Sequence, residues 1–158
     1  MADRKEFRGQ VDLKGQTTIH NTRTQNLNAA KNLTAADCGN ILLGVVGTQQ
    51  AAGTGFNLNL PTPARGLHYR FTLAAPSIEN NSNAAITITA TSDGSTAANI
   101  AVGSVTTNGA PTNVVAGVDI VTFVHNVATA GDYAECYCDG TNWFFTIVGD
   151  AAGAVTLA

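Results

Sequence analysis

The chain has 158 residues, a formal net charge of −3 and only 12% charged side chains, about half of the roughly 25% that is usual for soluble globular domains. This length suits one domain with a core of its own, and Ala, Thr, Asn and Gly replace the missing charges, a balance common in extracellular and virion β-proteins. The longest apolar run, residues 41–47, is far shorter than the about 20 residues that cross a bilayer, and residues 1–10 lack the apolar core of a secretion signal, so we expect neither a membrane partner nor export by the general secretory route.

Residues 1–30 are polar and are predicted to form an extended N-terminal arm that binding partners order. Residues 1–31 contain six basic and three acidic side chains, a net charge of +3, whereas the remainder contains two arginines and eight acids, a net charge of −6. A basic arm on an acidic body favours docking onto an acidic protein surface. Nucleic acid is not the expected partner, because acids interrupt the bases and no aromatic platform accompanies them. The bases expected to make the contact are Arg4, Lys5, Arg8 and Lys14.

Residues 31–158 are predicted to form a single all-β domain, a β-sandwich or jelly-roll-like barrel. No window supports a long amphipathic helix, and turn residues interrupt the alternating apolar pattern roughly every 8 to 15 residues, as in short strands joined by turns. The segment KNLTAADCGN, residues 31–40, is predicted to include one helical turn that begins at Thr34 and ends near Gly39.

Two strands are predicted in the segment that follows. Residues 56–60 alternate apolar and polar side chains, and Pro61 ends this strand. Residues 67–73 alternate in the way that a half-buried strand requires. The inward side chains are expected to be Leu67, Tyr69, Phe71 and Leu73, and the outward ones His68, Arg70 and Thr72.

The next two segments differ in the size of their apolar side chains. Residues 86–89, ITIT, form a predicted strand with the isoleucines inside and the threonines outside. Residues 92–117 are rich in turn residues and poor in large apolar side chains, so they are predicted to form loops with one or two short edge strands.

The segment VDIVTFVHN, residues 118–126, is apolar on both faces apart from Asp119, Thr122 and His125. A strand without a plainly polar side lies either at the centre of the domain or at a contact between subunits. We therefore predict that its outward face forms a trimer contact. The candidate residues for that contact are Val121, Phe123 and His125.

The sequences DYAECYC and NWFFTIV, on either side of Asp139-Gly140-Thr141, predict an antiparallel hairpin. On its first strand, Cys136 and Cys138 project to the same face with Cα atoms roughly 6.6 Å apart, near the outer limit for a disulfide and poorly aimed for one. On its second strand, Trp143 is predicted to pack in the core because it alternates with apolar residues.

A metal site is not expected in this chain. Zinc would need further thiolates or imidazoles close to Cys136 and Cys138, but Cys38 stands alone and the three histidines show no paired spacing. The prediction is therefore of buried thiols next to Ala134, with no metal or other cofactor. Whether Cys38 pairs with another thiol is left open.

No catalytic residue is predicted, because the sequence contains none of the common nucleophile, phosphate-loop, metalloprotease or calcium-loop motifs. Asp119 and His125 could be drawn as part of a triad, but they lie on one strand, three rows apart. Carbohydrate binding is the alternative to a purely structural role, because aromatic side chains could stack on sugars and the Asn- and Thr-rich loops could bond to their hydroxyls. The candidate platforms are Tyr69, Tyr133, Tyr137 and Trp143.

Three segments in order carry a resemblance to a known family: LTAADCGNILLGV at 33–45, LPTPARGLHYRFTL at 60–73 and GDYAECYCDGTNWFF at 131–145. Their combination resembles small virion proteins of tailed bacteriophages, especially marine and cyanobacterial phages. The resemblance is to the capsid decoration, or cement, proteins, and it covers roughly residues 33–148. It implies a compact β-barrel or jelly roll.

The resemblance also implies a function. Proteins of this kind sit as homotrimers on the outside of the phage head, where they contact the major capsid protein and stabilise the shell. The expected location is therefore the capsid surface of the virion, and the expected role is structural. A fibre, spike or tail-associated domain that recognises host surface glycans is the alternative, because similar patterns occur in those proteins.

Overall fold

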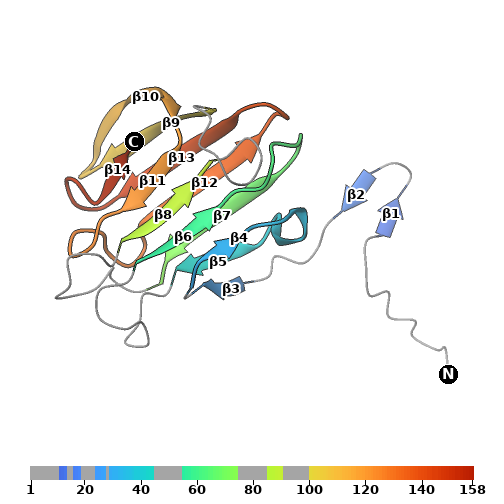
Figure 1. Ribbon diagram of the computed structural model, residues 1–158, viewed down its shortest axis with the longest axis horizontal. Helices are drawn as coiled ribbons and strands as arrows, with labels where there is room; N and C mark the ends of the chain where they lie inside the picture. Colours follow the sequence, from blue (N-terminus) through green and yellow to red (C-terminus); the bar gives the residue numbers. More distant parts are fainter. Residues whose placement is uncertain are drawn as a thin grey trace.

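A computed structural model describes residues 11–13, 16–18, 24–27, 29–44, 55–74, 85–90 and 100–158 of the chain. In these ranges the polypeptide forms two large sheets packed face to face, together with a small hairpin and one short 3-10 helix (Figure 1). The predicted all-β sandwich is therefore confirmed. Within the described ranges, no helix is both long enough and apolar enough to cross a membrane.

The larger sheet has seven strands and the smaller has five. Across the seven-stranded sheet the order is β10 (Ala110–Val118), β9 (Ala101–Thr107), β13 (Trp143–Gly149), β12 (Tyr133–Cys138), β7 (His68–Leu73), β5 (Ile41–Gly44) and β3 (Thr24–Leu27). Across the five-stranded sheet it is β14 (Val155–Leu157), β11 (Ile120–Phe123), β8 (Ile86–Thr89), β6 (Phe56–Asn59) and β4 (Lys31–Asn32). The remaining strands, β1 (Val11–Leu13) and β2 (Gln16–Thr18), pair with each other.

The chain alternates between the two sheets in the first half of the sandwich. Strands β3, β5 and β7 are parallel neighbours in one sheet, while β4, β6 and β8 are parallel neighbours in the other (Figure 1). This part is therefore a three-coil parallel solenoid with one strand per sheet in each coil. The connectivity differs from the jelly roll implied by the resemblance, which is built from antiparallel strands. Antiparallel strands β12, β13, β11 and β14 complete the sandwich, and β9 runs parallel to β13.

The body of the protein begins earlier in the chain than the predicted boundary at residue 31. Strand β3, Thr24–Leu27, pairs in parallel with β5 at the edge of the seven-stranded sheet. Leu27 belongs to the hydrophobic core. The physical reason is that Gln25 and Leu27 share one face of this short strand, so residues assigned to the polar arm supply inward side chains.

The core lies between the two sheets and contains the side chains that strand alternation placed inside. Tyr69, Ile88 and Trp143 are fully buried, and the ring centroids of Tyr69 and Trp143 lie 5.9 Å apart. The Tyr69 hydroxyl donates a 2.9 Å hydrogen bond to the carbonyl oxygen of Thr34. The inward positions predicted for residues 67–73 and 86–89 are confirmed.

A helical turn at Ala35–Asp37, which the sequence predicted, closes one end of the core. The Asp37 carboxylate accepts hydrogen bonds from the backbone N–H and the hydroxyl of Thr34 at 2.9 and 3.0 Å, and it pairs with Lys31. With its amide oriented to satisfy both partners, Gln25 donates to Asp37 and accepts from Lys31. A bonded polar group thus covers the apolar interior next to β3 and β4.

The prediction for residues 92–117 is wrong where the structure describes them. Strands β9 and β10 form a long hairpin, and β9 lies inside the sheet between β10 and β13. Asn108 and Gly109 both have positive φ, 50° and 69°, as a tight two-residue hairpin turn requires. At Gly103 strand β9 approaches β13 closely, because a Cβ added there would lie 2.5 Å from the carbonyl oxygen of Phe145.

Replacing Gly103 with alanine should destabilise the protein by about 1–3 kcal/mol, because the clash is with backbone that cannot rotate away. The measurement is the midpoint of urea-induced unfolding. Ser104→Ala is the matched control, since Ser104 is exposed on the same strand and its hydroxyl can be lost without a clash. Equal midpoints for Gly103→Ala and the control would contradict the close approach of the two strands.

The Asp37 carboxylate should make the stability of the protein depend on pH in the acid range. Burial raises the pKa of Asp37, but the hydrogen bonds from Lys31 and Thr34 outweigh burial and hold the pKa below its usual 3.8. The stabilisation is therefore complete above about pH 4 and is lost as the pH falls through the lowered pKa. Asp37→Asn should cost about 1–3 kcal/mol at pH 7 and should show less further loss at pH 3 than the wild type.

Urea unfolding at pH 7 and pH 3 measures this difference. Asp150→Asn is the control, because the Asp150 side chain is exposed. If Asp37→Asn retains the full acid sensitivity of the wild type, another carboxylate is responsible for it.

Candidate functional site: the outer face of the seven-stranded sheet

The structure corrects the predicted trimer contact. Val121 and Phe123 are 1% exposed and lie in the core of the single chain, so neither is available to another subunit. Strand β11 lies between β8 and β14, and its alternation turns these two side chains inward while Ile120 and Thr122 face outward. The sequence could not make this choice because both faces of the strand are largely apolar. His125, the third candidate, follows the strand and is half-buried.

The four bases predicted for the arm lie outside the described residues, so their predicted contact with an acidic surface stays a prediction. They are Arg4, Lys5, Arg8 and Lys14.

The three cysteines are free thiols, and two of them are buried on the inward face of β12 as predicted. Burial raises the pKa of the Cys136 thiol well above its usual value. Cys38 is half-buried, and its sulfur accepts a 3.3 Å hydrogen bond from the backbone N–H of His68. Cys138 accepts one of 3.3 Å from Gly140. Among the residues that the structure describes, no group of three or more His, Cys, Asp or Glu side chains could hold a metal ion.

Asp119 and Asp139, which the sequence analysis named, form hydrogen bonds that stabilise the fold. Asp119 is buried, and one of its carboxylate oxygens accepts a 3.2 Å hydrogen bond from the backbone N–H of Ile100. Asp139 accepts 2.8 Å bonds from the N–H groups of Thr141 and Asn142, which fixes the turn of the predicted hairpin. Strands β12 and β13 form that hairpin with the expected antiparallel pairing.

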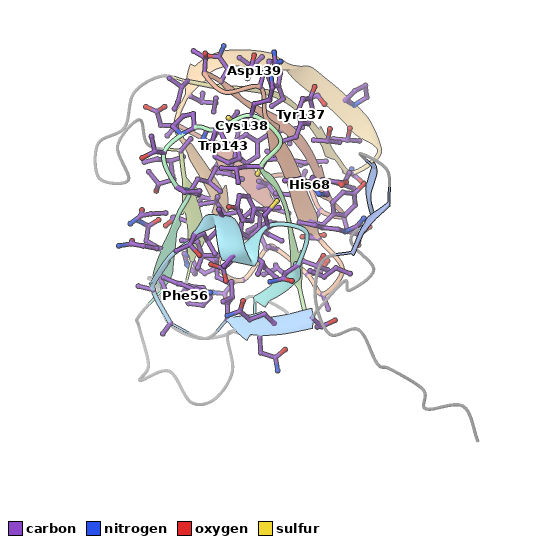
Figure 2. All side chains as sticks on the ribbon, turned by 90° about the vertical axis from the view of Figure 1, so that its right-hand side faces the viewer. Phe56, His68, Tyr137, Cys138, Asp139 and Trp143 are labelled. Carbon is purple, nitrogen blue, oxygen red and sulfur yellow. The ribbon has the colours of Figure 1, made fainter. Side chains whose placement is uncertain are left out.

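The four aromatic side chains proposed as sugar platforms separate into two groups. Tyr69 and Trp143 are fully buried and cannot meet a ligand. Tyr133 and Tyr137 alternate with the buried residues of β12, so they lie on the side of the seven-stranded sheet that is turned away from the core. Tyr137 is labelled in Figure 2. Both tyrosines belong to a patch that we call the outer aromatic face. It consists of His68, Arg70, Tyr133, Glu135, Tyr137 and Phe144.

Strand register brings these six side chains together. Tyr137 of β12 is paired with His68 of β7 on one side and with Phe144 of β13 on the other. Glu135 is paired with Arg70 in the next outward row. Outward residues of adjacent strands stand close enough to interact, so the face is a direct product of the two pairings of β12.

The side chains of the outer aromatic face contact one another. The Tyr137 and Phe144 rings stack with centroids 5.0 Å apart and an angle of 12° between their planes. The Arg70 guanidinium lies 4.6 Å from the centroid of the Tyr133 ring. Glu135 lies between two basic side chains, with one oxygen 2.7 Å from His68 Nε2 and the other 4.0 Å from Arg70 Nη1.

One member of the face is unusually exposed. Tyr137 is 55% exposed, and among the described residues it is the only large hydrophobic side chain that is exposed to solvent. An exposed aromatic group on an ordered strand, surrounded by further aromatic and charged groups, is typical of a binding surface.

The outer face of the five-stranded sheet is of a different kind. The Asn57 amide oxygen accepts hydrogen bonds of 2.8 Å from the hydroxyls of both Thr87 and Thr89. Its nitrogen donates to Asn59, which in turn donates to Asn32, at 2.7 and 2.8 Å. This face is therefore neutral, and its polar groups are bonded to one another. The outer aromatic face is the stronger candidate for a contact with another molecule.

Comparison with known proteins adds no assignment to this geometry. No protein-family model matches the chain. No curated protein matches it, and no solved structure does.

Sequence reasoning found part of the face and missed the rest. His68 and Arg70 were predicted to point outward, and Tyr133 and Tyr137 were named as possible platforms. Phe144 and Glu135 were not singled out. The signal in the hairpin was incomplete, because a three-residue turn at Asp139-Gly140-Thr141 would pair Tyr137 with Trp143. Strands β12 and β13 are instead separated by Asp139–Asn142, which pairs Tyr137 with Phe144.

The thiols should differ sharply in reactivity. In native protein at pH 8, a disulfide reagent such as dithionitrobenzoate should titrate only Cys38, because Cys136 and Cys138 are buried and thiolates, not thiols, react. All three should react in denaturant. Cys38→Ser is the control and should leave no reactive thiol in the native protein. Rapid reaction of two or more thiols without denaturant would contradict the buried position of Cys136 and Cys138.

Proposed function

We propose that this chain is a structural virion protein, a decoration or cement protein that binds the outside of a bacteriophage head as a homotrimer and stabilises the shell. The proposal starts from the resemblance of residues 33–45, 60–73 and 131–145 to that family. The chain has no catalytic residue in this role, and its partner is the major capsid protein.

A structural role is supported by the position of the three segments that resemble decoration proteins, because they meet in the core of the sandwich. They are brought together around Tyr69, whose hydroxyl binds Thr34 of the first segment and whose ring contacts Trp143 of the third. Some polar groups of these segments bind backbone of the protein itself. Asp132, for example, is 3% exposed and accepts bonds of 2.8 and 2.9 Å from the N–H groups of Thr129 and Asp150. Tyr69, Asp132 and Trp143 thus maintain the shape of the sandwich.

Such a protein stabilises a shell by adding contacts. A trimer offers three copies of each attachment site, and simultaneous attachment strengthens binding without any single strong contact. The basic arm is the attachment element, since its net positive charge complements acidic patches on the capsid protein. The sandwich supplies the rigid body from which the three arms extend.

Binding to purified heads that lack the protein tests this function. The wild type should co-sediment with the heads, and electron microscopy should show it on their outer surface. Deletion of residues 2–16 should leave a folded sandwich, judged by circular dichroism, with binding reduced at least about tenfold, since several charge contacts are removed.

A full-length variant with Arg4, Lys5, Arg8 and Lys14 changed to glutamine separates charge from length. It should lose most of the binding and should show a weaker dependence on salt than the wild type. A truncated protein that still decorates heads would contradict attachment through the arm.

A fibre or spike domain that recognises host glycans is the second candidate. The observation in its favour is the exposure of Tyr137 beside Tyr133 on one ordered sheet. Electron microscopy of the virion distinguishes the two functions, because a decoration protein covers the head whereas a spike lies at the tail or at vertices.

A further inference from the structure

We infer that the outer aromatic face is the surface through which copies of this chain bind one another. The inference rests on the proposed function, because it supplies the trimer contact that Val121 and Phe123 cannot make. Its occupant is a second copy of the same chain.

The composition of the face suits a protein contact. Tyrosine, phenylalanine and arginine are enriched at the centres of protein interfaces, where a few of them contribute most of the binding free energy. The face has two tyrosines, one phenylalanine and one arginine on three adjacent strands, and the most exposed of them is Tyr137. The five-stranded sheet has no comparable group on the outer face formed by Asn57, Asn59, Thr87 and Thr89.

The geometry of the rings favours a protein over a sugar. A sugar stacks on the flat face of an aromatic ring. Here Tyr137 and Phe144 turn their flat faces toward each other, and the Arg70 guanidinium covers a face of Tyr133. One face of each of these three rings is therefore already covered, so less flat ring surface remains for a sugar, whereas ring edges and hydroxyls remain for the side chains of a protein partner.

The charges of the face complement a second copy of themselves. Glu135 lies between His68 and Arg70, so acid and base stand side by side in the same patch. Around a three-fold axis the face of each copy meets the face of the next, so Glu135 of one copy can lie opposite Arg70 of its neighbour. An acidic capsid surface would instead bring acids against Glu135, and like charges at an interface are penalised. The arm and the face therefore suit different partners.

The extent of the face sets its place in such a contact. The six side chains lie on three adjacent strands, so they form the centre of the contact. Neighbouring surface of the same chain supplies the rest of the about 800 Å² that a stable interface buries on each partner.

Sedimentation of the full chain tests the inference. The wild type should sediment as a trimer at micromolar concentration. Tyr137→Glu should raise the dissociation constant at least about 30-fold, because it places a charge at the centre of the contact. Thr156→Glu is the matched control: Thr156 is exposed on β14 of the other sheet, so the same charge there should leave the oligomer unchanged. Circular dichroism verifies that both variants are folded.

A charge exchange provides a second test that does not depend on the tyrosine. Arg70→Glu and Glu135→Arg should each weaken the oligomer, and a mixture of the two single variants should form mixed oligomers more tightly than either forms alone. A wild type that stays monomeric at 100 μM, or a Tyr137→Glu variant that sediments like the wild type, overturns the inference. Binding of a glycan by monomers that Tyr137→Glu abolishes also overturns it.

The outcomes distinguish this inference from the proposed function. An oligomer that Tyr137→Glu dissociates, in a protein that does not bind heads, supports the contact and rejects the decoration role. Monomers bound to heads support the decoration role and reject the contact.

Discussion

The packing of Tyr69 against Trp143 is the contact on which the other parts of the sandwich depend. Tyr69 comes from the third coil of the solenoid and Trp143 from the hairpin that follows it, so this one ring pair joins the parallel and antiparallel halves of the fold. Burial raises the pKa of the Tyr69 hydroxyl, which therefore stays protonated and donates to Thr34. The Trp143 indole N–H finds no acceptor among the described residues. Its ring is therefore held by apolar packing alone, although a buried N–H without a partner costs free energy.

Alternation in the sequence predicted the strands wherever one face is polar, as at residues 67–73, and the Asp-Gly turn predicted the hairpin. The apolar pattern of the sequence led to a wrong prediction in two places, for different reasons. Residues 118–126 are apolar on both faces, so their pattern identifies a strand without saying which side is inside. Within residues 100–118, Gly103 leaves no room for a side chain because the backbone of Phe145 is close, and that closeness exists only after folding. The parallel order of the coils was likewise not predictable, because it depends on pairings between distant segments.

The candidate site also combines features that follow from one strand with features that depend on the pairing of several strands. Outward positions on one strand, such as His68 and Tyr137, follow from alternation within that strand. The contacts of the face do not, because the stacking of Tyr137 on Phe144 and the position of Glu135 between two bases require the register of three strands. The contrast with the Asn and Thr network on the opposite sheet is also a property of the folded molecule.

The coiled half of the sandwich has a consequence for how such a protein can evolve. Successive coils differ in length, since Thr24, Ile41 and Arg70 stand at equivalent positions in three neighbouring strands, yet the parallel alignment is kept because the connecting loops absorb the difference. A duplicated coil inserted at this end would widen both layers by one strand each and leave the hairpin and its aromatic surface untouched. Relatives of different size could therefore share the same outer aromatic face, with the number of coils setting how far the arm begins from it.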